Sequence, residues 1–335
     1  MKTIKLKYVD FWPEVNPDNY FFTEVLRKKF NVIISEEPDY IFYGPFGNEN
    51  LKYMDCIRIF YTGECVVPDF NFCDYAIGFD RITFPDRYFR LPLFYLYDSN
   101  MLNQMMNKHI IDGNFQNRDK FCGFVVSNVN GKFRNECFEL LSMYKKVDSG
   151  GRYMNNIDLP EGVADKEAFD REHKFSLCFE NQSYPGYLSE KLPQAFAHGC
   201  IPIYWGDPTV GETFNEKAFI NVNSYSSFQQ AMEKIKYIDA NNDEYLKMLS
   251  EPAIVDEKYY PEIVLGEFEA FLFSIFDQPL NQCRRRTHSN FASCKLEIYN
   301  MGIIAKEKDS HSIKNYIRRM YRFLIRKLKT IQSVR

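Results

Sequence analysis

One stretch, residues 174–206, constrains the fold of this chain more than any other. It reads KFSLCFENQSYPGYLSEKLPQAFAHGCIPIYWG: an apolar run that ends abruptly in Glu180 and Asn181, a Tyr/Pro/Gly turn, a helix-capable segment and a second apolar run. Two short apolar runs joined through a helix predict parallel strands of an α/β fold. Because ligands of open α/β folds bind at the carboxyl ends of the strands, the polar residues of the first connection are candidates for a ligand site.

The same alternation extends over most of the chain. In the first half, short β-prone runs lie at residues 4–9, 31–34, 40–43, 57–61 and 75–78, and residues 17–30 form a helix-capable segment that opens with a proline and an acidic residue. In the second half, we predict strands at residues 121–127, 174–179, 200–205 and 219–222, and helices at residues 133–146, 190–198 and 226–238. The predicted fold class is therefore α/β, with parallel sheets covered by helices.

The length of the chain predicts more than one domain. Its 335 residues suit two domains of roughly 100 to 200 residues each. A polar stretch at residues 107–120 interrupts the pattern, so we predict an N-terminal domain over residues 1–117, a second domain over residues 118–280 and a tail over residues 281–335. Two Rossmann-like domains facing one another would leave a cleft lined by the carboxyl ends of both sheets.

Charge is distributed unevenly along the chain. The net charge of the chain is −3. The tail, residues 281–335, contains 14 Lys and Arg and 3 Asp and Glu, whereas the body, residues 1–280, contains 28 Lys and Arg and 42 Asp and Glu. The tail is therefore +11 and the body −14. A basic tail on an acidic body indicates a separate role for the tail, most simply binding to an anionic surface.

The cysteines and the N-terminal sequence predict a cytoplasmic protein. Nine cysteines are scattered along the chain without a C-x-x-C pair, and several lie in apolar runs, so we expect buried free thiols in a reducing compartment. The first residues, MKTIKLKYVDFWPEV, lack the apolar core of a signal peptide, and no apolar stretch reaches the length of a membrane span.

The helix start within residues 174–206 is suited to an anionic ligand. Ser189 is a candidate N-cap, which would start the helix near Glu190 and bring the Lys191 ammonium close to unpaired backbone N–H groups. Such an arrangement suits a diphosphate. Taken alone, Glu190 and Lys191 could equally be surface residues compatible with the helix dipole.

Other polar residues of this connection suit a sugar or a ribose. Glu180, Asn181, Tyr187 and Glu190 supply donors and acceptors for hydroxyl groups. The chain contains neither G-x-x-x-x-G-K-[ST] nor G-x-G-x-x-G, so we do not expect a P-loop or a dinucleotide-binding site of the usual kind.

Two further residues follow predicted strands at the same edges. Arg134 lies in the first turn of the helix predicted at residues 133–146, so that Arg134 and Lys191 could hold one diphosphate between them; a surface arginine is the alternative. Glu64 follows the strand at residues 57–61, where a carboxylate could act as a general base on an acceptor hydroxyl. A solvated loop glutamate is the competing interpretation of Glu64.

In several segments the chain resembles the α-1,3/4-fucosyltransferases, glycosyltransferase family 10, and especially the bacterial α-1,3-fucosyltransferases. The matching segments are FENQSYPGYLSEK with CIPIYWGDPTV, YTGECVVPDFNFCDYAIGFD, DRYFRLPLFY and FVVSNVNGKFRN, in family order through about residue 280. The resemblance implies a glycosyltransferase-B fold of two facing Rossmann-like domains, with GDP-β-L-fucose held by the C-terminal one. It also implies Glu64 as catalytic base, Arg134 and Lys191 as diphosphate ligands, and contacts from Asn181, Tyr187 and Glu190 to the nucleotide sugar.

The mechanism that the resemblance implies is a single inverting displacement. Glu64 would take the proton of the acceptor hydroxyl while Arg134 and Lys191 stabilise the charge of departing GDP. The chain has no D-x-D triad, so we expect no essential metal, although a divalent ion could help neutralise GDP. Pro193 departs from helix preference, and it is tolerable only because it lies near the helix N-terminus.

The tail contains a candidate membrane-binding helix. Residues 313–331, IKNYIRRMYRFLIRKLKTI, alternate apolar side chains at spacings of three and four with Arg and Lys on the other face. Basic amphipathic helices of this kind commonly lie in an anionic membrane interface, so we expect peripheral association with the inner face of the cytoplasmic membrane. Packing on the body or on a partner is the alternative, and nucleic-acid binding is not expected because no motif accompanies the charge.

The leading functional prediction is transfer of fucose from GDP-fucose to the 3-OH of N-acetylglucosamine in a β-galactoside such as N-acetyllactosamine. One alternative keeps the fold but changes the acceptor, the linkage or the donor sugar. Another is a two-lobed sugar-binding protein without catalysis, for which Glu64 would be dispensable. The sequence does not predict the oligomeric state.

Overall fold

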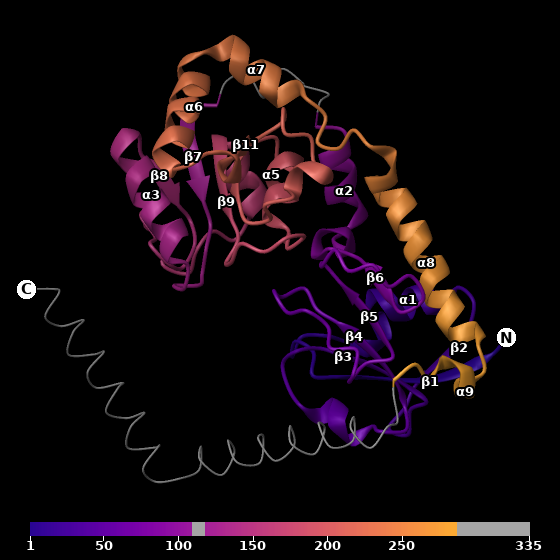
Figure 1. Ribbon diagram of the computed structural model, residues 1–335. Coiled ribbons are helices and arrows are strands. Elements are labelled where there is room, and N and C mark those ends of the chain that lie inside the picture. Colours follow the sequence, from indigo (N-terminus) through magenta and orange to yellow (C-terminus); the bar gives the residue numbers. More distant parts are fainter. Residues whose placement is uncertain (109–117, 287–335) are drawn as a thin grey trace, which may run out of the picture. The chain divides into compact units, whose positions relative to one another are not determined.

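The computed structural model describes residues 1–108 and 118–286, and within it residues 1–285 form one compact unit (Figure 1). The amphipathic segment predicted at residues 313–331 lies outside the described residues. Two sheets, both entirely parallel, organise the described chain. The predicted fold class is confirmed: the chain is α/β with parallel sheets.

The first sheet contains six strands in the order β2-β1-β3-β4-β5-β6. Their bounds are β1 (Thr3–Val9), β2 (Asn31–Ile34), β3 (Tyr40–Tyr43), β4 (Ile57–Tyr61), β5 (Tyr75–Gly78) and β6 (Tyr88–Arg90). Every residue of β3, β4 and β5 is buried, as expected of central strands covered on both faces. The edge strand β2 instead alternates between exposed and half-buried residues.

The second sheet contains five strands in the order β11-β10-β9-β7-β8. Their bounds are β7 (Lys120–Phe124), β8 (Val147–Ser149), β9 (His173–Phe179), β10 (Ile201–Trp205) and β11 (Ile220–Asn221). The helices that follow its strands are α3 (Lys132–Tyr144), α4 (Lys166–Arg171), α5 (Lys191–Ala197) and α6 (Phe228–Ala240), and α7 (Asn242–Ser250) comes directly after α6. In Figure 1, α3 lies beside β7 and β8.

The remaining helices are associated with the first sheet or with the connection between the sheets. They are α1 (Phe21–Arg27), α2 (Ser99–Met106), α8 (Pro261–Asp277) and α9 (Leu280–Cys283). The helix-capable segment at residues 17–30 is divided in the structure, because a 3-10 turn at Pro17–Asn19 precedes α1. Helix α2 packs on α5.

Helix α8 belongs to the core of the first sheet, although it follows the second sheet in the chain. The ring of Phe276 lies 4.4 Å from that of Tyr40, and the ring of Phe268 lies 5.4 Å from that of Phe22. Lys2 Nζ donates to Phe276 O at 2.7 Å. The strands of the first sheet lie within residues 1–117 and those of the second within residues 118–280, but the division of the chain into domains at those residues remains a prediction.

The cysteines of the described chain are all free thiols, and seven of the eight are buried. Burial raises the pKa of the thiols of Cys73 and Cys178 to about 12, which keeps them protonated and unreactive. Among the described residues, no helix combines the length and the apolar character needed to cross a membrane.

Candidate active site

The strand order of the second sheet places a switch point at β7 and β9. The chain runs outward from β7 to β8, then returns to β9 on the other side of β7 and continues to β10 and β11. In open α/β sheets, ligands bind beyond the carboxyl ends of the strands at such a point. Arg134, in the α3 helix that follows β7, and Asn181, two residues after β9, both lie there.

Arg134 is held in one orientation and is only 1% exposed. Its Nη1 donates to Asn181 Oδ1 at 3.1 Å, and its Nη2 donates to Asn128 O at 2.5 Å. Gly131 lies beneath the guanidinium, since a Cβ there would be 2.9 Å from Arg134 Cζ. Burial lowers the pKa of Arg134, but a guanidinium remains charged at neutral pH. Arg134 is thus a fixed cation at the switch point.

The carboxylate of Glu180 is the centre of a buried polar cluster. It accepts hydrogen bonds from Ser189 N at 2.8 Å, from Ser189 Oγ at 2.7 and 2.9 Å, and from Lys191 Nζ at 2.9 Å. Lys191 Nζ also donates to Ser189 Oγ at 2.8 Å. Burial alone would lower the pKa of Lys191, but the carboxylates of Glu180 and Glu190 raise it above its ordinary value. Lys191 is therefore a charged ammonium at a defined position.

This cluster corrects two details of the sequence-based prediction. Ser189 is not the N-cap of α5: the helix begins at Lys191, its N-cap is Glu190, and no side chain caps it. The reason is that Glu180 takes both the hydroxyl and the backbone N–H of Ser189. Glu180 is also completely buried, so it is not a free acceptor for sugar hydroxyls. Pro193 falls at the third residue of α5, within the first turn, where proline is tolerated.

Glu190 remains partly exposed beside this cluster. Its Oε1 lies 3.6 Å from Lys191 Nζ. Burial raises the pKa of the Glu190 carboxyl, but the positive charges of Lys191 and Lys166 together with hydrogen bonds lower it below its ordinary value. Tyr97 interacts electrostatically with Glu190: burial raises the pKa of the Tyr97 phenol, and the negative charge of Glu190 raises it further.

Tyr187 is buried at the end of the Tyr/Pro/Gly turn. Its ring makes an edge contact with Phe79, with centroids 5.1 Å apart. Gly186 has a φ of +84°, and a Cβ there would lie 2.6 Å from Phe79 O, so the turn requires glycine. Gly186 N donates to Asp207 Oδ1 at 2.7 Å, which anchors the turn to the segment after β10.

Glu64 follows β4, and its side chain is partly exposed. Its backbone is fixed by Thr62, since Glu64 N donates to Thr62 Oγ1 at 2.9 Å. The pKa of Tyr187 is raised by burial, then by Glu180, and further by the charge of Glu64. Glu64 is therefore within electrostatic range of the residues that follow β9, although it comes from the first sheet.

The structure thus gathers the predicted residues to different degrees. Arg134 contacts Asn181 directly, and Lys191 lies beside Glu190. Arg134 and Lys191 share no direct contact, but both interact electrostatically with Glu180. Tyr187 interacts electrostatically with both Glu64 and Lys191. The arrangement supplies two cations, a hydrogen-bonding amide and two carboxylates, and the roles of these residues remain predictions.

Comparisons with known proteins identify the family. The N-terminal domain model described as alpha-(1,3)-fucosyltransferase FucT matches residues 6–97, and the model described as glycosyltransferase family 10 (fucosyltransferase), C-terminal, matches residues 115–250. The chain belongs to glycosyltransferase family 10. These two matches contain all six of the predicted site residues.

Similar proteins in the family share most of this chain. The alpha-(1,3)-fucosyltransferase of Helicobacter pylori is 32% identical over 307 residues, a match that covers 78% of this chain. This chain spans only 64% of the length of that relative. A crystal structure of an alpha1,3-fucosyltransferase is 30% identical with a TM-score of 0.69, and one with GDP-fucose is 28% identical with a TM-score of 0.67. Each structural match covers 81% of this chain, and 90% and 91% of the respective structures. The predicted glycosyltransferase-B-like fold is thereby confirmed.

Two residues of this family-10 chain support the site without having been predicted from the sequence. A Cβ on Gly206 would lie 2.4 Å from Glu180 Cγ and 2.7 Å from Tyr204 Oη. The Tyr204 hydroxyl in turn accepts from Asp207 N at 2.8 Å. The only signal in the sequence was the glycine immediately after an apolar strand, which often marks close approach of another group.

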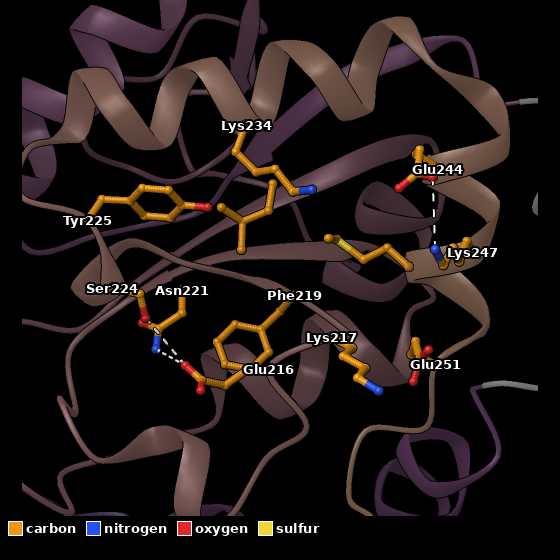
Figure 2. A pocket seen from close by; sticks show the side chains of 12 residues that line it. Glu216, Lys217, Phe219, Asn221, Ser224, Tyr225, Lys234, Glu244, Lys247 and Glu251 are labelled. Atoms are coloured by element: carbon orange, nitrogen blue, oxygen red, sulfur yellow. Dashed lines mark hydrogen bonds and ion pairs between the residues drawn. The ribbon is translucent and has the colours of Figure 1, made fainter.

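A separate cavity of about 550 Å³ lies in the region of β11, α6 and α7 (Figure 2). None of the predicted site residues lines it. Its charged lining residues are three lysines and three glutamates, with Glu216 bound by Asn221 Nδ2 at 2.7 Å and Lys247 3.9 Å from Glu244. Because these charges balance, the cavity offers no net attraction to a diphosphate. The lining residues are Glu216, Lys217, Phe219, Ile220, Asn221, Ser224, Tyr225, Lys234, Glu244, Lys247, Met248 and Glu251.

Within residues 1–108 and 118–286, no group of three or more His, Cys, Asp or Glu side chains is arranged to hold a metal ion. Two His–Asp pairs in this part of the chain are buried around the second sheet. His173 Nε2 lies 3.1 Å from Asp148 Oδ2, and His198 Nδ1 lies 2.7 Å from Asp170 Oδ2.

Proposed function

We propose that this protein transfers L-fucose, with inversion, from GDP-β-L-fucose to the 3-OH of N-acetylglucosamine in N-acetyllactosamine-type glycans. The observation that carries the proposal is the position of Arg134, Asn181 and Lys191 after β7 and β9, at the switch point where nucleotides bind in such sheets. It is supported by the similarity to an alpha1,3-fucosyltransferase that was crystallised with GDP-fucose.

In the proposed complex, the donor diphosphate lies between Arg134 and Lys191. Both cations are already fixed by neighbouring groups, so little side-chain entropy is lost when the diphosphate binds. As the bond between fucose and GDP breaks, negative charge grows on the departing phosphate, and preorganised cations stabilise it. Asn181, Tyr187 and Glu190 contact the nucleotide sugar.

Glu64 is the proposed general base. It comes from the first sheet, whereas the donor ligands come from the second, so the acceptor hydroxyl would enter between them. Glu64 removes the proton of this hydroxyl as the oxygen attacks the anomeric carbon of fucose from the face opposite GDP. Holding acceptor and donor in line contributes proximity to the rate. No essential metal is part of the proposal, and a divalent ion would only help neutralise GDP.

We also propose that the basic segment at residues 313–331 associates with the inner face of the cytoplasmic membrane. The support is its sequence alone, which combines an apolar face with arginines and lysines.

Incubation of the purified protein with GDP-fucose and N-acetyllactosamine tests the transferase proposal, with the linkage of the product determined by NMR. We expect fucose α-1,3-linked to N-acetylglucosamine, together with one GDP for each fucose transferred. A protein that binds GDP-fucose and the acceptor but forms no product would support the non-catalytic alternative. Product from a different sugar nucleotide, and none from GDP-fucose, would contradict the assignment of the donor.

A further inference from the structure

Three neighbouring strands of the first sheet end at the same edge, and each leads to a residue of interest. Strands β1, β3 and β4 are adjacent and parallel, with Val9 opposite Tyr43 and Tyr43 opposite Phe60. The segments that follow them carry Trp12, Phe46 and Glu64, respectively. Parallel strands have their carboxyl ends on one edge, so two aromatic residues and the proposed base lie along a single line of strand ends.

The two aromatic side chains form a platform, which we call the Trp12–Phe46 platform. Their rings have centroids 5.0 Å apart at an angle of 57°. The Trp12 ring also lies 6.2 Å from the ring of Tyr61, the last residue of β4, which is three residues before Glu64. Phe46 is 49% exposed and Trp12 is partly exposed. Phe46 and Trp12 thus form an exposed aromatic pair on the segments that follow β3 and β1.

The backbone beneath the platform is tightly fixed. Asp10 has a φ of +59°, a left-handed conformation that is uncommon in a non-glycine residue. Its carbonyl accepts from Phe46 N at 3.1 Å, and its carboxylate accepts from Glu49 N at 2.9 Å and from Asn50 N at 2.8 Å. A Cβ on Gly47 would lie 2.2 Å from Asp10 Oδ1. Asp10 therefore binds the segment that carries Trp12 to the loop that carries Phe46.

The platform is connected to the donor residues through two tyrosines. Tyr61, which packs against Trp12, interacts electrostatically with Tyr97. Tyr97 in turn interacts electrostatically with Glu190, one of the residues proposed to contact the nucleotide sugar. The series of neighbours from Trp12 through Tyr61 and Tyr97 thus ends at one of the proposed donor residues.

We propose that the Trp12–Phe46 platform binds the galactose ring of a β-galactoside acceptor, an inference that rests on the proposed function. The reacting N-acetylglucosamine must lie at Glu64. Adjacent strands are about 5 Å apart, so β3 and β1 lie about 5 and 10 Å from β4, a displacement that suits the neighbouring, non-reacting sugar. One face of β-galactose presents only C–H groups, and the electron-rich face of an aromatic ring attracts these partially positive hydrogens.

The test compares Phe46→Ala with Tyr237→Ala, since Tyr237 is 50% exposed on α6 and outside the proposed site. We expect Phe46→Ala to raise KM for N-acetyllactosamine about three- to tenfold, the range of a single aromatic contact. The KM for GDP-fucose, hydrolysis of GDP-fucose without acceptor, and transfer to free N-acetylglucosamine should not change. Tyr237→Ala should behave as the wild type. An unchanged KM for N-acetyllactosamine in Phe46→Ala, or an equal loss with free N-acetylglucosamine, would overturn the inference.

Fluorescence gives a readout that does not depend on transfer. The chain has two tryptophans, so Trp12 is the only one left in a Trp205→Phe variant. N-acetyllactosamine should change the Trp12 emission saturably, and adding Phe46→Ala should raise the half-saturating concentration about three- to tenfold. A saturable change of Trp12 emission in Trp205→Phe, combined with no fucose transfer by the wild type, would refute the proposed function but support binding at the platform. Transfer without a change in Trp12 emission would refute the platform alone.

Discussion

The buried pair of Glu180 and Lys191 allows a sharp prediction about stability. Glu180→Gln keeps the shape of the side chain but replaces one carboxylate oxygen with an NH₂ group. This group would face the Lys191 ammonium or the Ser189 hydroxyl, both of which donate to Glu180 in the structure. A donor would then face donors, and the Lys191 charge would lose its nearest compensating partner.

The size of the effect follows from burial. Removing one partner of a buried ion pair costs about 3–5 kcal/mol. The Glu180 side chain is fully buried but the Lys191 side chain is 20% exposed, and water can partly solvate the released ammonium. We therefore expect Glu180→Gln to lower the free energy of unfolding by about 3 kcal/mol, at the lower end of that range.

Urea unfolding at pH 7 measures this loss, and a double-mutant cycle assigns it to the pair. Lys191→Met removes the other partner with little change in size. The double variant should lose less stability than the sum of the single variants, with a coupling energy of about 1–3 kcal/mol. A free energy of unfolding for Glu180→Gln within about 0.5 kcal/mol of the wild-type value would contradict this account of the cluster, because ordinary surface substitutions have effects of that size.

Three further predictions follow from individual residues and from the tail. Lys108 is buried and its pKa is lowered to about 7, so between pH 7 and its ordinary pKa of 10.5 the unfolded chain binds a proton that the folded chain lacks. The free energy of unfolding of the wild type should therefore rise with pH in this window, by at most about 1.4 kcal/mol per pH unit more than that of Lys108→Met. Urea unfolding of both proteins over this pH range measures the rise. An equal dependence of the unfolding free energy on pH in the two proteins would contradict the prediction. Gly206→Ala should destabilise the protein by about 1–3 kcal/mol, because the added Cβ would clash with the Glu180 side chain. Gly266→Ala in α8 should stabilise it by about 0.5–1 kcal/mol, because no atom lies within 4 Å of the added Cβ and alanine favours a helix. Equal shifts of the two variants in thermal unfolding would contradict the packing described. Truncation at about residue 310 should abolish binding to anionic vesicles in a sedimentation assay and leave fucose transfer unchanged. Loss of transfer with unchanged vesicle binding would contradict the proposed membrane role of the tail.

Much of the fold was predictable because its central strands are short, largely apolar and β-prone runs. The runs at residues 40–43, 57–61 and 75–78 coincide with β3, β4 and β5, which are buried on both faces. Strand β8 was not predicted, since it contains Asp148 and Ser149 and no apolar run. Asp148 is satisfied by His173, 25 residues away, and such a partner cannot be inferred from local sequence.

Helix α8 was missed for a related reason. Its apolar residues pack against a sheet formed more than 200 residues earlier in the chain, with Phe276 against Tyr40. Local periodicity does not reveal such a partner.

Within the candidate site, the sequence predicted which connections carry the polar residues but not the hydrogen bonds among them. Arg134 and Lys191 were predicted to hold one diphosphate between them, but the hydrogen bond of Arg134 to Asn181 was not predicted. Ser189 had the residue type and the position of an N-cap, but the buried Glu180 competes successfully for it. A carboxylate with no access to water takes every donor within reach, and this competition depends on burial, which the sequence alone does not give.

The central claim is that Glu64 acts as the base in fucose transfer, and one measurement tests it most directly. Single-turnover transfer from GDP-fucose to N-acetyllactosamine is compared for the wild type and Glu64→Gln, with GDP-fucose binding measured by calorimetry on the same samples. We expect Glu64→Gln to bind GDP-fucose with unchanged affinity and to transfer fucose about 10²–10⁴ times more slowly, the usual contribution of a general base. A Glu64→Gln variant that transfers fucose as fast as the wild type would contradict the account.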